Sequence, residues 1–152
     1  MAQPEGPARP IVVGWKEYLA LPELGIDRLK AKVDTGARTS TLHVASLRVV
    51  AEHADGTAEL ELTLPLDRRH PERSAIARAR MLRRVTVRDS GGHREVRPLI
   101  ATDLVLGPVR KRIFLTLTDR SGMLFRMILG RKALEGDFLV DVSRSYLLQR
   151  QL

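Results

Sequence analysis

The distribution of hydrophobic and polar positions along the chain is mainly that of β-strands. Alternation of apolar and polar residues predicts strands with one buried face in four segments: 29–33, 60–64, 85–88 and 113–118. Clusters of turn-forming residues separate such segments at 54–57, 89–92 and 119–122. Many short strands with a turn roughly every ten residues are typical of a sandwich or a small barrel.

Two segments have helical character. Residues 68–82 have the propensity, but Pro71 and a high charge density would keep any helix there short. Residues 131–135, followed by Gly136, predict one or two helical turns with a glycine stop. We therefore predict one all-β domain over 11–152, a sandwich or a small barrel with one short C-terminal helix. Residues 1–10 are expected to form a disordered lead.

Composition narrows the class of protein further. The chain has 152 residues, of which 43% are hydrophobic and 29% charged, as in ordinary globular proteins. No apolar run approaches the ~18–20 residues that span a bilayer, and 1–10 lack the apolar stretch of a signal peptide. Cysteine is absent, which excludes disulfides, thiolate zinc sites and a cysteine nucleophile. We expect a cytoplasmic protein with no membrane partner.

Basic residues exceed acidic ones, giving a formal net charge of +8. Much of the excess is arginine, with seven arginines between Asp67 and Arg84 against two acidic residues. Such a field attracts nucleic acid, a membrane surface or an acidic polypeptide, but it is also compatible with a solvated loop. Charge alone does not choose among these.

The segment 31–40 carries the strongest chemical signal. An alternating strand ends in Asp34, Thr35 and Gly36, followed by Ala37 and Arg38. Backbone N–H groups can hold a carboxylate at a tight turn, and Gly36 allows the main chain to approach it. Alone, the triplet would most often be an Asx-turn that closes a strand.

A second segment makes the first more specific. Residues 127–134 are an apolar strand, then Gly130 and Arg131, then a short helical segment. The pair resembles the two signatures of retropepsin-like aspartic proteases, in which the late glycine strand supports the catalytic loop. From residue 12 onward the chain resembles the bacterial RimB-type family, whose members are often labelled ATP-dependent zinc proteases. Further matching segments are 13–17, 21–25, 42–43, 84–85 with 90–92, 95–98, 118–120 with Met123, and 129–131.

The resemblance implies an all-β fold, a small closed barrel of the retropepsin-like acid protease type with one short C-terminal helix. It also implies an aspartic peptidase with Asp34, Thr35 and Gly36 as catalytic residues. Ala37 and Arg38 would bind substrate, although Arg38 would serve equally as a structural ion pair. Gly130 and Arg131 would support the loop. Aspartic proteolysis needs two carboxylates that share a proton, and one motif per chain implies a homodimer.

The zinc and ATP parts of the family label find no support in the residues. The four histidines are scattered without the His-Glu-x-x-His spacing, and no P-loop motif is present. We therefore predict no metal site and no cofactor. The turns at 55–56 and 90–92 are both candidates for a flap over the cleft.

The resemblance also implies an acidic substrate. RimB-type proteins occur with a RimK-type ligase that adds glutamates to the C-terminus of a ribosomal protein, and the basic residues fit a peptidase that trims such tails. The alternative is a non-catalytic module that binds and regulates the ligase. Six aromatic residues in the chain argue against direct RNA binding.

Overall fold

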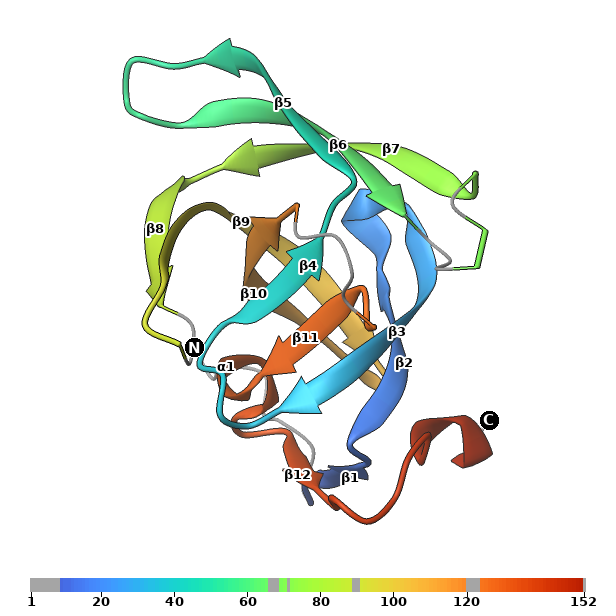
Figure 1. Ribbon diagram of the computed structural model, residues 1–152. Helices are drawn as coiled ribbons and strands as arrows, with labels where there is room; N and C mark the ends of the chain where they lie inside the picture. The colour runs from blue at the N-terminus through green and yellow to red at the C-terminus, as the bar shows by residue number, and fades with distance from the viewer. Residues whose placement is uncertain (1–8, 66–68, 71, 89–90, 120–123, 152) are drawn as a thin grey trace, which may run out of the picture.

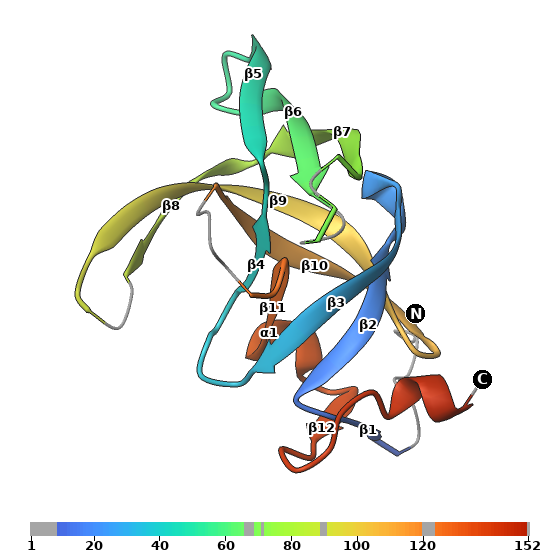
Figure 2. The ribbon, with the colours of Figure 1, turned by 45° about the vertical axis from the view of Figure 1, so that its right-hand side comes forward.

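The computed structural model describes residues 9–65, 69–70, 72–88, 91–119 and 124–151 (Figures 1 and 2). Within them the elements follow in this order: β1 (Ile11–Val13), β2 (Lys16–Leu21), η1 (Pro22–Leu24), β3 (Ile26–Asp34), β4 (Ser40–His43), β5 (Ser46–Glu52), β6 (Ala58–Pro65), β7 (Ser74–Met81), β8 (Arg83–Arg88), β9 (Arg94–Leu106), β10 (Val109–Thr118), β11 (Met127–Gly130), α1 (Arg131–Leu134), β12 (Phe138–Val140) and η2 (Leu148–Gln151). The predicted all-β class with one short helix is confirmed, and all four predicted strands form. None of the helices among these residues is long enough to cross a bilayer.

Six strands of the main sheet pair around a ring. Hydrogen-bonded neighbours follow the order β10-β4-β11-β3-β2-β9, and β9 also pairs with β10. The β9–β10 hairpin is long, with Val109 opposite Leu106 and Thr116 opposite Leu99. The link between β2 and β9 is one residue pair, Ala20 with Val105. The ring is therefore nearly closed, which falls just short of the closed barrel that we predicted.

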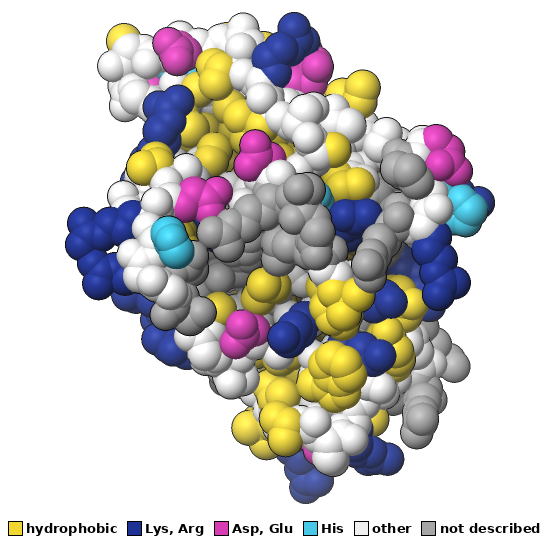
Figure 3. Space-filling view, viewed as in Figure 1, with side chains coloured by type: hydrophobic (Ala, Val, Ile, Leu, Met, Phe, Trp, Pro, Cys, Tyr) yellow, Lys and Arg dark blue, Asp and Glu magenta, His cyan; other side chains and the backbone are white. Residues whose placement is uncertain are grey.

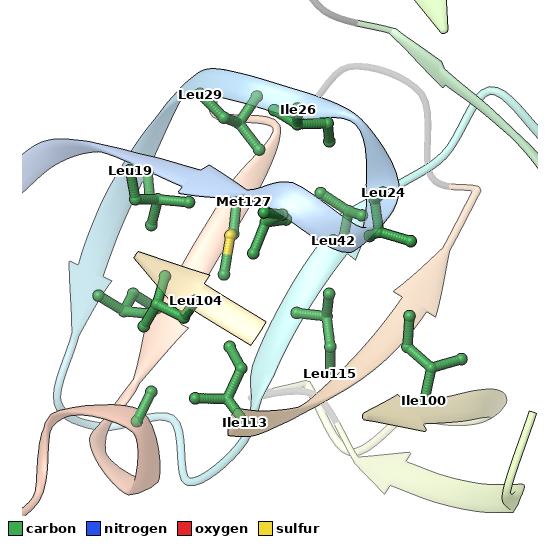
Figure 4. Packing of buried hydrophobic residues seen from close by; sticks show 14 of the residues in the cluster. Leu19, Leu24, Ile26, Leu29, Leu42, Ile100, Leu104, Ile113, Leu115 and Met127 are labelled. Atoms are coloured by element: carbon green, nitrogen blue, oxygen red, sulfur yellow. The ribbon is translucent and has the colours of Figure 1, made fainter. Parts of the chain in front are cut away.

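The hydrophobic core fills the interior of this ring (Figure 4). Along β2 every second side chain is buried, as expected of a strand with one face toward the core, whereas β4 is buried at all four residues. Each fully buried leucine of this kind stabilises the fold by about 1.5–3 kcal/mol relative to exposure. The fully buried members include Leu21, Leu42, Leu104, Leu115, Met127 and Leu129.

A separate sheet of β5, β6 and β7 lies across one end of the ring (Figures 1 and 2). The predicted helical tendency of 68–82 is wrong for its described part, because 74–81 form strand β7. Ala77 and Met81 alternate inward, and β7 pairs with β6 along its whole length. Salt bridges from Arg78 to Glu61 and from Arg80 to Glu59 connect the two strands. Pairing between strands therefore overrides local helix propensity here.

The two ends of the described chain meet beside the ring. Strands β1 and β12 form a parallel pair from Ile11–Phe138 to Val13–Val140. The expected lead at 1–10 lies outside the described residues except for its last two. Val12 and Leu139, which are opposite each other in this pair, and Val142, two residues after β12, are exposed hydrophobic side chains.

The β8–β9 hairpin extends beyond the ring and curves past the loop between β3 and β4 (Figure 2). Its two strands pair from Arg83–Leu99 to Arg88–Arg94. Here β9 has left the ring and has β8 as its partner, so the hairpin forms an arm. The arm and the loop after β3 border the site described next.

Candidate active site

Asp34 is the last residue of β3, at the point where the chain turns toward β4. Ala31 and Val33 are buried, and the alternation of the strand ends at the half-buried Asp34. The Gly36 N–H donates to Asp34 Oδ1 at 3.0 Å, and the Ala37 N–H donates to the Asp34 carbonyl at 3.2 Å. The turn therefore fixes one carboxylate oxygen, as the predicted Asp-Thr-Gly motif requires.

Gly130 lies against the back of this loop. It pairs with Asp34 where β11 and β3 run parallel. A Cβ at residue 130 would lie 2.8 Å from the Thr39 carbonyl carbon and 2.9 Å from the Ala37 oxygen. Both are backbone atoms that cannot move aside without distorting the loop, so this position requires glycine.

Three backbone N–H groups connect the β11–α1 junction to the loop. The Arg131 N–H donates to the Ala37 carbonyl at 2.8 Å, and the Lys132 N–H donates to the Arg38 carbonyl at 3.1 Å. The Gly130 N–H donates to Ser40 Oγ at 3.0 Å. The guanidinium of Arg131 is exposed, so Arg131 supports the site through its backbone.

Buried hydroxyl groups continue the network beneath the loop. Thr41 Oγ1 and Thr116 Oγ1 are 2.9 Å apart, and the Thr116 hydroxyl donates to the Ser40 carbonyl at 3.4 Å. The Arg97 guanidinium donates to Thr41 Oγ1 at 3.4 Å and forms an ion pair with Glu95 at 3.0 Å. These bonds attach the start of β4 to β10 and to the arm.

A cleft of about 1220 Å³ opens in front of Asp34. One side consists of the loop at 36–41, the other of β8 residues 83 and 85–88, with parts of β10 between them. Neither residue of the turn at 55–56 lines this cleft. Of the two flap candidates, the β8–β9 hairpin is thus the one that borders the site; part of its turn, residues 89–90, lies outside the described chain.

The cleft is strongly basic. Among its described lining residues, Asp34 is the one acid, and six residues are basic: Arg38, Arg83, Arg88, Arg97, Arg112 and Lys132.

Three of these cations are paired and three are not. Arg97 pairs with Glu95 at 3.0 Å, Arg112 with Glu23 at 2.7 Å and Lys132 with Glu135 at 3.4 Å. The guanidinium groups without an ion pair to any described residue are those of Arg38, Arg83 and Arg88.

In the described part of the chain, no three His, Cys, Asp or Glu side chains come together in a way that could hold a metal ion. His43 is buried at the end of β4, and its ring Nδ1 has no hydrogen-bond partner among the described residues. His53 and His70 are exposed beside Glu59 and Glu72.

A family model described as "RimB-like: Retropepsin-like aspartic endopeptidase RimB" matches residues 12–151. The chain belongs to this family.

Curated relatives include a probable alpha-L-glutamate ligase of Shewanella halifaxensis, 36% identical over 92% of this chain. A protein of the same name from Parasynechococcus marenigrum is 39% identical over 92% of the chain. In both cases the chain spans about 30% of the length of the relative. A crystal structure of protein Lpg0085 from Legionella pneumophila, of unknown function, shares the fold with a TM-score of 0.73 at 23% identity. That match covers 92% of this chain and 99% of the other.

The RimB-like fold brings most of the predicted site residues together. Asp34, Gly36, Ala37 and Arg38 line the cleft. Gly130 and the Arg131 backbone lie directly behind the loop, as the family signatures imply.

Thr35 differs from the other motif residues. Its side chain is exposed and does not line the cleft. No hydrogen-bond partner of the Thr35 hydroxyl is found in the described part of this chain. The catalytic role of Thr35 stays a prediction.

Several residues of the site were not predicted from the sequence. Ser40 ends the motif and carried no assigned role, yet it accepts the Gly130 N–H. Thr41 and Thr116 gave no signal beyond lying in apolar strands. Arg83 and Arg88 were seen only as part of a basic surface or a strand, because their approach to Asp34 depends on how the hairpin curves.

Proposed function

We propose that this protein is an aspartic endopeptidase that works as a homodimer, with Asp34 of each copy at a shared centre. The observation that carries this proposal is the fixed Asp34 carboxylate at the edge of a cleft whose other ionisable lining residues, within the described chain, are basic. The RimB-like family match supports the same reaction class.

In the proposed reaction the two Asp34 carboxyl groups share one proton and bind one water. The ionised carboxylate removes a proton from the water as its oxygen attacks the peptide carbonyl carbon. The protonated carboxyl gives its proton to the carbonyl oxygen, forming a tetrahedral intermediate. Collapse of that intermediate breaks the C–N bond, and the proton taken from the water passes to the leaving amine. No metal or nucleotide enters these steps.

Two features of one copy support dimerisation. Thr35 extends from the loop with an exposed side chain. Val12 of β1 and Leu139 of β12 are opposite each other and are 43% and 58% exposed, and Val142, two residues after β12, is 78% exposed. Exposed apolar side chains that gather on one small unit are typical of an interface.

The proposed substrate is an acidic polypeptide, a glutamate-tailed ribosomal protein in the cytoplasm, with a RimK-type ligase acting in the same system. Arg38, Arg83 and Arg88 support it, because each offers a planar fork of N–H donors that can bind a carboxylate bidentately. They lie on both sides of the cleft. The curated relatives named as probable alpha-L-glutamate ligases support a connection with glutamate addition.

The test is cleavage of a C-terminally polyglutamylated peptide by the wild type and by Asp34→Asn. Asp27→Asn is the matched control, because Asp27 is an exposed aspartate on the same strand and outside the cleft. We expect loss of cleavage in Asp34→Asn alone, no effect of a chelator, and a steep decline above ~0.15 M salt as screening weakens the attraction. Full activity of Asp34→Asn would refute the proposal.

A second candidate is a non-catalytic module that binds and regulates a glutamate ligase. It is favoured by one observation, that the matching segment is about 30% of proteins named as ligases. This function predicts binding of the glutamylated peptide without cleavage, and equal affinity for the wild type and Asp34→Asn.

A further inference from the structure

Four of the six aromatic side chains of the protein lie together on the outer face of β2 and β3 and beside it. Trp15 and Phe125 are in edge-to-face contact, with ring centroids 6.2 Å apart. Tyr18 and Tyr146 are stacked, with centroids 5.0 Å apart. We call this group, with the cations described next, the β2–β3 face.

Basic side chains lie between these rings. The Lys16 ammonium is 4.6 Å from the centroid of Trp15 and 5.1 Å from that of Tyr146, so it connects the two aromatic pairs. Arg28 lies 4.0 Å over Tyr18, and Lys30 lies 5.8 Å from the Phe125 centroid.

Strand register explains why the cations share one face. Lys16 is opposite Lys32, and Tyr18 is opposite Lys30. Residues 28, 30 and 32 of β3 are all exposed, while the residues between them point into the core. None of these cations makes an ion pair with a described residue. Figure 3 shows hydrophobic and basic side chains alternating where β2 and β3 run in Figure 1.

The backbone at Tyr146 indicates that this arrangement is specific. Tyr146 has a φ of 55°, which makes it the one non-glycine residue with positive φ in the described chain. Tyrosine rarely adopts this conformation. The Tyr146 N–H donates to the Lys16 carbonyl at 3.0 Å, and its ring is stacked on Tyr18. The chain thus accepts an unfavourable backbone conformation where the ring joins the β2–β3 face.

We propose that the β2–β3 face binds single-stranded RNA. Cations that track a phosphate backbone, interleaved with rings on which bases stack, form the general pattern of single-strand recognition. Lys16 and Lys30 have flexible stems and can move from the ring faces to phosphates. Arg28 offers a guanidinium plane that stacks on bases in the same way as a ring.

The aromatic rings favour RNA over an acidic peptide. Carboxylates gain from the cations but gain little from Trp15 and Phe125, whereas every base has a flat face to stack. The choice of RNA over DNA rests on the proposed function, in which the substrate belongs to the ribosome. The small number of aromatic residues argued against RNA binding from the sequence. Because four of the six rings lie together, they supply a stacking surface that scattered rings would not.

The experiment is fluorescence anisotropy with a labelled single-stranded oligouridine, measured over a range of salt concentrations. Arg28→Gln/Lys30→Gln is compared with Arg83→Gln/Arg88→Gln, which removes the same charge from the cleft. We expect the first pair to weaken binding at least tenfold and to reduce the log–log salt slope by about 1.4, at about 0.7 per phosphate contact. The cleft pair should leave both unchanged.

Trp15→Leu tests the stacking contribution separately. It should weaken binding about 5- to 150-fold with an unchanged salt slope, because a stacked base is lost and no phosphate contact is lost. Equal weakening by the two double variants would overturn the proposal in favour of net charge. A raised KM for the polyglutamate peptide in Arg28→Gln/Lys30→Gln, without RNA binding, would overturn it in favour of a peptide. Asp34→Asn should retain RNA binding. The RNA-binding result can therefore be interpreted even if the protein does not cleave the peptide.

Discussion

Substitution of Gly130 by alanine tests whether the β11–α1 junction holds the catalytic loop. The added methyl group would meet the Thr39 carbonyl carbon at 2.8 Å, the Ala37 oxygen at 2.9 Å and the Arg38 oxygen at 3.0 Å. All three are backbone atoms, so the loop as a whole has to move. Overpacking of this kind typically costs about 1–3 kcal/mol.

Movement of the loop also breaks hydrogen bonds that cross the contact. The bonds from Gly130 to Ser40, from Arg131 to Ala37 and from Lys132 to Arg38 contribute about 0.5–1.5 kcal/mol each. Overpacking together with the loss of one of these bonds gives a total destabilisation of about 1.5–4.5 kcal/mol. For a chain of this size that lowers Tm by about 3–18 °C.

Gly36→Ala is the matched comparison at the front of the same loop. Gly36 is exposed, and the one atom near its added Cβ is Asp34 Oδ1 at 3.2 Å. Stability should change by no more than about 0.5 kcal/mol. Peptidase activity should fall about tenfold or more, because the methyl group displaces the carboxylate that activates water.

Thermal and urea unfolding of both variants, with peptide cleavage, separate the two roles. Wild-type stability in Gly130→Ala would refute the close approach of residue 130 to the loop. Equal loss of stability in both variants would show that the loop is fixed from its front as well as from behind.

Three further predictions concern residues outside the cleft. Glu17 is fully buried and accepts three backbone N–H bonds near both chain ends; Glu17→Gln should lower the free energy of urea unfolding by about 2–4 kcal/mol, since it turns a donor toward those groups. Burial and then Arg126 lower the pKa of His43 against an opposing effect of Asp119, so the unfolded chain binds the proton more readily. The free energy of unfolding should therefore fall as pH drops below about 6.5. In urea unfolding, His43→Gln should lose less stability than the wild type between pH 7.5 and pH 5.5. Leu139→Glu, which places a charge on an exposed apolar strand, should shift sedimentation from dimer to monomer with an unchanged circular dichroism spectrum; an intact dimer would place the interface elsewhere.

Features with a local cause could be predicted from the sequence. The alternation in 29–33 and 60–64 reflects one buried face, and both segments form strands. The Asp34 turn is indicated by an aspartate two residues before a glycine, whose N–H binds the carboxylate. The end of the short helix is indicated by Gly136, which adopts a φ of +85°. Each of these needs only a few neighbouring residues to form.

Features that depend on distant partners could not be predicted. Strand β7 is rich in alanine and arginine, which favour helices in isolation, and it is extended because it pairs with β6 along its whole length and buries Ala77 and Met81. The curvature of the β8–β9 arm similarly brings Arg83 and Arg88 to the cleft. Tyr146 reaches Tyr18 from far along the chain through a backbone conformation with no sequence signal.

The pairing of charges, more than their number, separates structural from ligand-directed cations in this protein. Arg78, Arg80 and Arg112 belong to the positive excess, but each has a carboxylate partner that holds two strands or a strand and a turn together. Arg38 and Arg88 have no such partner in the described chain and border the cleft. A guanidinium beside a cleft that makes no ion pair can donate its N–H groups to an anion without breaking a contact that stabilises the fold. A net charge of +8 therefore overstates the charge that is open to an anion, because the paired cations are engaged within the fold. Among the described residues, the cations without an ion pair include Arg38, Arg83 and Arg88 at the cleft and Arg28, Lys30 and Lys32 on β3.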